Sequence, residues 1–121
     1  MDDAYLNLTQ HSATPDQIKA GVFEPEDKEL VQKWLTFTSK PTKEDIVEHA
    51  SMLSGIARRS GFKKIMIGGA PYLMGVLEGF LRADGLIPVY AWSERVSVDI
   101  PQEDGSVRKV NSFRHAGFIE L

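Results

Sequence analysis

The chain has 121 residues and no cysteine, and 42% of its residues are hydrophobic, which suits one globular domain with a single core. The formal net charge of −3 argues against a duplex-DNA-binding protein, because such proteins present a basic face. No apolar run approaches the roughly 20 residues of a membrane-spanning helix. The acidic N-terminus lacks the apolar core of a signal peptide. We therefore expect a cytoplasmic domain over residues 1–121, with no disulfide and neither a membrane nor a duplex-DNA partner.

The N-terminal segment predicts a strand followed by a short helix. Residues 5–11 (YLNLTQH) alternate between apolar and polar, as strands do. Thr14 and Gln17 flank a proline in a capping-box pattern, which predicts a helix over residues 15–20. Four polar residues then lie at the end of the strand or in the loop after it: Asn7, Thr9, Gln10 and His11.

Two further helices are predicted in the middle of the chain. Residues 26–34 place apolar side chains on one face, and a polar break follows over residues 36–41. Thr42 can cap the next helix, in which apolar residues recur every three to four positions between residues 46 and 57. Arg58 and Arg59 suit its negative C-terminal end, so this helix is expected to lead the chain back to a central strand.

A strand–glycine loop–helix–strand unit follows, and the rest of the chain is expected to be arranged around it. The apolar run 65–67 predicts a buried strand, and Gly68-Gly69 allows a sharp turn and the close approach of a ligand. Pro71 suits the first position of a helix that Gly85 ends, and residues 86–90 predict another strand. Such units bind ligands at the carboxyl ends of their strands.

The C-terminal third predicts a β-hairpin. Its arms are expected over residues 93–100 and 106–113, with a turn at Asp104-Gly105 and a last short strand at residues 118–119. Together with the preceding elements, this hairpin predicts an α/β domain whose sheet is mainly parallel and flanked by helices.

The Gly68-Gly69-Ala70-Pro71 loop is the first candidate binding site. It leads into a helix N-terminus, where free backbone N–H groups bind anions. It matches neither the Walker loop nor the dinucleotide-binding fingerprint, and a plain tight turn explains it equally well. Gly75 and Gly79 lie one turn apart on the same helix, which is more typical of close packing than of a binding site.

The strand end Trp92-Ser93-Glu94-Arg95 is the second candidate. Arg95 can bind a phosphate through two hydrogen bonds, and Trp92 can stack on a base. The alternative is a surface arginine that pairs with Glu94 and a tryptophan that belongs to the core.

His11, Arg114 and His115 are the remaining candidates. A histidine can transfer protons as a general acid or base, and Arg114 can face the same ligand if the hairpin folds beside the sheet edge. The alternatives are surface histidines and a hairpin whose exposed charges aid solubility. No cluster has the spacing of a metal site, and no hydrolase nucleophile elbow is present, so we predict neither a metal nor a cofactor.

Several of these segments together resemble a known family. They are residues 69–74 (GAPYLM), 85–91 (GLIPVYA), 93–95 (SER), 104–107 (DGSV) and 113–118 (FRHAGF), with 7–11 (NLTQH) and 14–17 (TPDQ) at the start. They are similar to small accessory proteins of type III CRISPR systems, which are single-domain, Rossmann-like relatives of CARF domains. Some of these are ring nucleases that cleave cyclic oligoadenylates. The segments are also similar to uncharacterised phage and prophage proteins, and residues 23–59 lie outside the resemblance.

The resemblance implies a Rossmann-like, CARF-like homodimer that binds a cyclic oligonucleotide, and it leaves open whether the ligand is also cleaved without a metal. Cleavage requires a ribose 2′-hydroxyl held in line with the adjacent phosphate. The implied roles are charge stabilisation by Arg95 or Arg114 and proton transfer by His11 or His115. The implied ligand contacts are Asn7, Thr9, Gln10, Gly68, Gly69, Ala70, Pro71, Tyr72, Trp92, Ser93 and Glu94.

Two alternatives to a ring nuclease remain open at this point. One is a non-enzymatic sponge that holds an intact messenger in the same pocket. The other is an interaction module without a nucleotide ligand, which would use the face of Gly75 and Gly79 for assembly.

Overall fold

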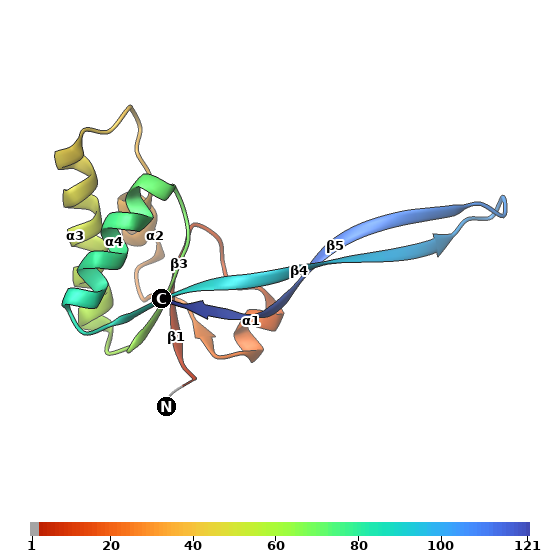
Figure 1. The fold of residues 1–121 in the computed structure, drawn as a ribbon, viewed down its shortest axis with the longest axis horizontal. Helices are drawn as coiled ribbons and strands as arrows, with labels where there is room; N and C mark the ends of the chain where they lie inside the picture. The colour runs from red at the N-terminus through yellow and green to blue at the C-terminus, as the bar shows by residue number, and fades with distance from the viewer. Residues whose placement is uncertain (1–2) are drawn as a thin grey trace.

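A five-stranded sheet with helices on both faces forms the body of the protein, and a long hairpin projects from it (Figure 1). The computed structural model describes residues 3–121. The elements in chain order are β1 (Tyr5–Leu8), α1 (Pro15–Lys19), β2 (Val22–Phe23), α2 (Lys28–Leu35), α3 (Lys43–Ser60), β3 (Lys64–Ile67), α4 (Pro71–Ala83), β4 (Ile87–Pro101) and β5 (Val107–Glu120).

The sheet is mixed, with the strand order β2-β1-β3-β4-β5. The first four strands in this order are parallel, whereas β4 and β5 are antiparallel. The expectation of a mainly parallel sheet was therefore wrong. The physical reason is that a tight turn can join only antiparallel strands, and this turn joins the two longest strands of the sheet.

Strand β2 was missed by the sequence analysis. It has only two residues, which pair with Tyr5 and Leu6 of β1. Two residues are too few to show the alternation by which a strand is recognised. Its place at the edge of the sheet is therefore set by tertiary packing.

The hairpin is longer than the sequence predicted, because the strands expected at residues 86–90 and 93–100 are one continuous strand, β4. Likewise, β5 runs without a break from Val107 to Glu120. The register shifts at Trp92/Ser93, where Ala116 has no direct partner on β4. Such a bulge bends and twists a hairpin without ending its strands.

Two hydrophobic clusters cover the two faces of the sheet. Helices α2, α3 and α4 lie together on one face, over Leu6, Leu8 and the β3 residues Ile65 and Ile67 (Figure 1). The opposite cluster is smaller and is built from Tyr5, Val22, Met66 and Val89, with Ala13 and Phe118 against it. The alternating side chains of β1 and β3 therefore supply both clusters, as expected for a sheet buried on both sides.

The helix ends agree closely with the capping patterns in the sequence. Thr14 and Thr42 each form a capping box with the residue three positions on. Gly61 ends α3 with a φ of 83°, a left-handed conformation that glycine adopts without strain. Helix α2 begins at Lys28 rather than at residue 26, because Asp27 accepts a hydrogen bond from the Leu30 N–H and acts as the cap.

Candidate functional site

An open crevice of about 520 Å³ lies at the carboxyl edge of the sheet. Strands β1 and β3 end side by side there, with Leu8 in register with Ile67. The loops that follow these strands and a short piece of β4 line the crevice. Its lining residues are Thr9, Gln10, His11, Ser12, Thr14, Gln17, Met66, Ile67, Gly68, Gly69, Tyr90 and Ala91.

Asn7 lies buried beneath the loop that forms one wall of this crevice and holds that loop in place through hydrogen bonds. Its side chain is only 1% exposed, yet all of its hydrogen-bonding groups are used. Its Nδ2 donates to the His11 carbonyl at 2.9 Å and to the Glu24 carboxylate at 3.2 Å. Its Oδ1 accepts from the Thr9 N–H at 2.9 Å and from the Thr9 hydroxyl at 2.7 Å. Asn7 was expected to contact the ligand, but the structure places it beneath the loop, where it holds Thr9 and His11 in position.

Glu24 anchors the same loop from the neighbouring edge of the sheet. One of its carboxylate oxygens accepts a hydrogen bond from the Ala13 N–H at 2.7 Å, and Lys28 lies 3.5 Å from the other. Burial raises the pKa of Glu24, but the hydrogen bonds from Ala13 and Asn7 and the charge of Lys28 outweigh burial and hold this pKa below its ordinary value. The Gln32 side chain donates to the Thr9 carbonyl at 3.2 Å, so three separate elements fix the loop.

The glycine loop after β3 forms the opposite wall. Gly69 has a φ of 155°, and a Cβ at Gly68 would lie in van der Waals contact with the Thr9 methyl group, at 3.5 Å. The loop leads into α4, whose N-cap residue, Ala70, provides no side-chain hydrogen bond. Pro71 has no N–H and the Leu73 N–H donates to the Ala70 carbonyl at 3.0 Å, so of the first three residues of α4 only Tyr72 keeps an N–H available to an anion.

The three residues that follow this loop do not line the crevice. Ala70 packs against the core of the helical face. The exposed ring of Tyr72 lies 5.9 Å from the Phe37 ring. Pro71 begins α4, as predicted, but is not part of the crevice lining. The crevice therefore includes Gly68 and Gly69 without the three residues after them.

The second group of predicted site residues lies on the hairpin, outside the crevice lining. The Arg95 guanidinium lies 5.9 Å from the Phe113 ring centre, and Arg114 lies 3.8 Å from the Glu94 carboxylate. Trp92 is 53% exposed. Ser93 pairs with His115 across the two strands.

His115 is the most enclosed of these hairpin residues. Its ring lies 4.8 Å from the Phe118 ring, and among the described residues neither ring nitrogen has a hydrogen-bond partner. Within one chain, His115 and the two arginines of the hairpin do not join the crevice.

Several crevice residues were not among the predicted site residues. Ser12, Thr14 and Gln17 line it because the loop after β1 and the start of α1 stand at its rim. Their polar character is visible in the sequence, but the pattern of Thr14 and Gln17 predicts only a helix cap. Tyr90 lines it from β4, and its hydroxyl donates to Glu78 of α4 at 2.6 Å. No sequence signal distinguished Tyr90 from a core residue.

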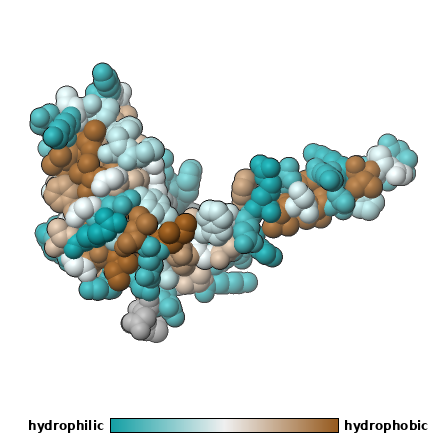
Figure 2. Space-filling model, viewed as in Figure 1, coloured by the Kyte–Doolittle hydropathy of each residue, from teal (hydrophilic) through white to brown (hydrophobic). Residues whose placement is uncertain are grey.

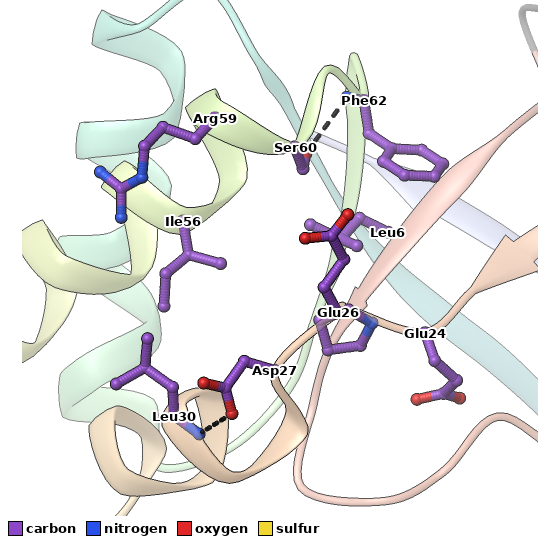
Figure 3. A pocket seen from close by; sticks show the side chains of 10 residues that line it. Leu6, Glu24, Glu26, Asp27, Leu30, Ile56, Arg59, Ser60 and Phe62 are labelled. Atoms are coloured by element: carbon purple, nitrogen blue, oxygen red, sulfur yellow. Dashed lines mark hydrogen bonds between the residues drawn. The ribbon is translucent and has the colours of Figure 1, made fainter.

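A second hollow of about 280 Å³ lies between the ends of α2 and α3 (Figure 3). Three carboxylates line it, those of Glu24, Glu26 and Asp27, together with the cation Arg59. Asp27 is occupied as the cap of α2, as the dashed line to Leu30 shows. This acidic lining repels anions such as phosphate groups.

Two classes of feature are not found in the described part of the chain. No group of three or more His, Asp or Glu residues between residues 3 and 121 is arranged to hold a metal ion. None of the helices in this range is long and apolar enough to cross a membrane.

One comparison with known proteins identifies the family. The model of the Uncharacterized protein MJ1673 family matches residues 3–119, so the chain belongs to this family. No curated protein and no solved structure matches the chain. The family description names no activity, so the resemblance to CARF-related proteins remains a prediction.

Proposed function

We propose that this member of the MJ1673 family binds a small phosphate-containing ligand of the nucleotide class in the crevice at the ends of β1 and β3. A cyclic oligonucleotide messenger is the first class to test. The observation that carries the proposal is the meeting of two loops, Thr9–Ser12 and Gly68-Gly69, at the carboxyl edge of adjacent parallel strands.

The strand order supports this choice of site. From β1 the chain moves to β2 on one side, and β3 lies on the other side. In open α/β sheets, ligands bind where the strand order reverses in this way. The crevice lies at this reversal, so we infer a Rossmann-like arrangement for the parallel part of the sheet, with β5 as an antiparallel addition.

The lining chemistry predicts how the ligand is held. Hydroxyl, amide and imidazole groups line the crevice together with glycine backbone, and no arginine, lysine or carboxylate is among the lining residues. Phosphate would therefore be bound by backbone N–H groups and hydroxyls. Because few charges pair on binding, affinity should change little between about 50 and 300 mM salt, unlike that of an arginine-based site.

Binding is favoured over cleavage. Of the four residues proposed for catalysis, only His11 lines the crevice, whereas Arg95, Arg114 and His115 lie on the hairpin. Without a cation near the phosphate, in-line attack by a ribose hydroxyl lacks its charge stabilisation. A sponge that holds the intact ligand therefore fits one chain better than a ring nuclease.

An interaction module is the second candidate function, because the hairpin exposes apolar side chains such as Val98 and Phe113. Gly75 and Gly79 mark the alternative surface for assembly, and both are exposed. A Cβ added at either glycine would meet no atom within 4 Å, so close packing within this chain does not require them.

A thermal-shift screen with cyclic di-, tri-, tetra- and hexanucleotides tests the proposal, followed by mass spectrometry of each mixture. A ligand that binds only the folded state must raise the melting temperature. Gly68→Val should abolish the shift, because its side chain fills the crevice beside Thr9, whereas Gly75→Val on the exposed side of α4 should retain it. Linear products would indicate a ring nuclease, and intact ligand a sponge.

The proposal fails if no cyclic nucleotide shifts the melting temperature of the wild-type protein. It also fails if Gly68→Val, shown to be folded by circular dichroism, binds as well as Gly75→Val. Loss of the shift in Arg114→Ala alone would move the site from the crevice to the hairpin.

A further inference from the structure

The hollow between the ends of α2 and α3, which we call the α2–α3 hollow, separates apolar from charged side chains (Figure 3). The projecting hairpin does not, because hydrophilic and hydrophobic residues interleave along its visible side (Figure 2). In the α2–α3 hollow, apolar residues from several elements form the floor, and charged residues stand around it. Such a division of chemistry is typical of a site that binds a small molecule.

Four apolar side chains form the floor of the α2–α3 hollow. Leu6 of β1 lies at its base and is only 2% exposed. Leu30 of α2, Ile56 of α3 and Phe62, which follows α3, are partly buried around it. Because these side chains come from separate parts of the chain, the hollow exists only in the folded protein. A molecule that binds there must therefore raise the melting temperature.

Three of the five polar residues in the lining already have partners within the chain. Glu24 holds the loop after β1 through the hydrogen bonds described above. Asp27 caps α2, and the Ser60 hydroxyl accepts a hydrogen bond from the Phe62 N–H at 3.1 Å. Dashed lines mark these last two interactions in Figure 3. The three side chains therefore stabilise the walls of the hollow.

The other two polar residues, Glu26 and Arg59, have opposite charges. Within residues 3–121, neither side chain takes part in an ion pair, with each other or with any other residue. Figure 3 shows Arg59 on α3 and Glu26, in the loop before α2, on opposite sides of the hollow. Once the partnered groups are set aside, the hollow offers one anion and one cation above an apolar floor.

Gly55 provides the space in which the Arg59 guanidinium lies. A Cβ at Gly55 would lie 3.0 Å from Arg59 Nη1, and the three atoms nearest to it all belong to Arg59. The arginine side chain therefore folds back along its own helix over a position without a side chain. Glycine is less favourable than alanine inside a helix, and Gly55 lies within the 18-residue α3. Its presence there is explained by the placement of the guanidinium.

The chemistry of the lining selects the ligand. A carboxylate binds a guanidinium through charge-assisted hydrogen bonds, and an ammonium group binds a carboxylate in the same way. A ligand with only a carboxylate would be repelled, because three carboxylates and one guanidinium line the hollow. A ligand with only an ammonium group would leave Arg59 without a partner. A small molecule with both charges and an apolar part matches every available group.

The size of the α2–α3 hollow agrees with a small ligand of this kind. Its volume of about 280 Å³ lies just below the roughly 300–1,000 Å³ of pockets that hold drug-sized molecules. We propose that the hollow binds a free α-amino acid with an apolar side chain, of which leucine is the first to test. The ligand carboxylate binds Arg59, the ammonium group binds Glu26, and the side chain covers Ile56 and Phe62.

Calorimetric titration and thermal shift of the full chain with leucine and three analogues test the proposal. Leucine should raise the melting temperature and bind with a dissociation constant of about 1 mM or below. Leucinamide lacks the carboxylate, 4-methylpentanoate lacks the ammonium group, and glycine keeps both charges without the apolar side chain. Each analogue should bind at least about tenfold more weakly than leucine. The weakest should be 4-methylpentanoate, because the acidic lining repels it.

Two matched pairs of variants test the charged residues. Glu26→Gln and Arg59→Gln should each weaken leucine binding at least about tenfold. Glu29→Gln and Arg58→Gln remove the same charges nearby but outside the lining, and should leave binding unchanged. Arg59→Gln should not weaken the binding of leucinamide, because this analogue has no carboxylate for Arg59 to bind.

Gly55→Ala tests the placement of the guanidinium separately from the stability of the fold. The new methyl group displaces Arg59 Nη1, which lies at the far end of a flexible side chain and can move. Alanine also favours the helix. The variant should therefore melt at or above the temperature of the unliganded wild-type protein and yet bind leucine more weakly.

Three results would overturn the proposal. They are a shift with about 20 mM leucine no larger than that with glycine, equally tight binding of leucinamide and leucine, and equal leucine binding by Glu26→Gln and Glu29→Gln. The outcome is separable from that of the proposed nucleotide-class ligand, because the two linings share no residue. Gly68→Val should still bind leucine, and Glu26→Gln should keep any shift caused by a cyclic nucleotide.

Discussion

Replacing Asn7 by aspartate tests whether the crevice loop depends on one buried amide. The substitution keeps the shape of the side chain but removes both of its Nδ2 hydrogen bonds, to the His11 carbonyl and to Glu24. It also places a second carboxylate beside the Glu24 carboxylate, at the 3.2 Å now spanned by a hydrogen bond. We expect a large and pH-dependent loss of stability.

The magnitude follows from the groups in contact. The lost hydrogen bonds account for about 2–4 kcal/mol, since one of them is to a charged group. The repulsion between the carboxylates is limited, because the pair can instead keep a proton. Holding a proton on an aspartate at pH 7 costs about 4.2 kcal/mol, which is therefore the largest destabilisation that the carboxylate repulsion can cause. At pH 7 the total therefore lies between about 2 and 8 kcal/mol, and its upper end is comparable with the stability of a whole small domain.

The sign of the pH dependence distinguishes this mechanism from a simple loss of packing. In wild-type protein the pKa of Glu24 is lowered, so its contribution to stability is present above the unfolded pKa and is lost as the pH falls through the folded pKa. In Asn7→Asp the folded state retains a proton that the unfolded state releases. The stability of the variant should therefore rise by about 1.4 kcal/mol for each unit by which the pH falls from 7 to 5.

Urea unfolding monitored by circular dichroism between pH 5 and pH 8 measures both effects. Adding Glu24→Gln to the Asn7→Asp background should restore much of the stability, because the amide of the new glutamine side chain can donate to the introduced carboxylate. Asn111→Asp on the exposed hairpin is the control and should cost less than about 1 kcal/mol. A loss of stability in Asn7→Asp that is the same at every pH would refute the reasoning.

Two further substitutions address the elements around the crevice. Tyr90→Phe removes the 2.6 Å hydrogen bond to Glu78 and should lower the free energy of unfolding by about 1.5–3 kcal/mol in urea titrations; no measurable loss would show that water replaces Glu78 as the partner. Thr42→Ala breaks the capping box of α3 and should cost about 1 kcal/mol, whereas Thr42→Ser should cost much less; equal losses would contradict a capping role.

Local signals in the sequence were sufficient to predict most of the helices and strands in the body of the protein. The capping patterns at Thr14 and Thr42 predicted where two of the helices begin, because a cap depends on residues within four positions of each other. The strand–Gly68-Gly69–helix unit was also predicted correctly. These features are local and need no knowledge of the rest of the chain.

The candidate site was predicted only in part. The sequence placed the residues after β1 and the Gly68-Gly69 loop at one edge, and the structure brings them together. It also assigned Asn7 to the ligand, whereas the structure buries this side chain beneath the loop. The alternation of β1 places Asn7 on the same face as Tyr5, opposite Leu6 and Leu8, but only the structure shows that this side chain is buried and binds Glu24, 17 residues later.

Pairing between residues far apart in the chain decided the features that the sequence did not predict. The two residues of β2 form a strand only because β1 lies beside them, and the sequence has no turn between Tyr90 and Ser93 that would end β4. Arg95 and Arg114 were expected at the sheet edge, but the continuous ladder of β4 and β5 carries them outward. Sequence patterns report which residues favour a strand, whereas the direction in which a strand extends past its sheet depends on pairing between residues far apart in the chain.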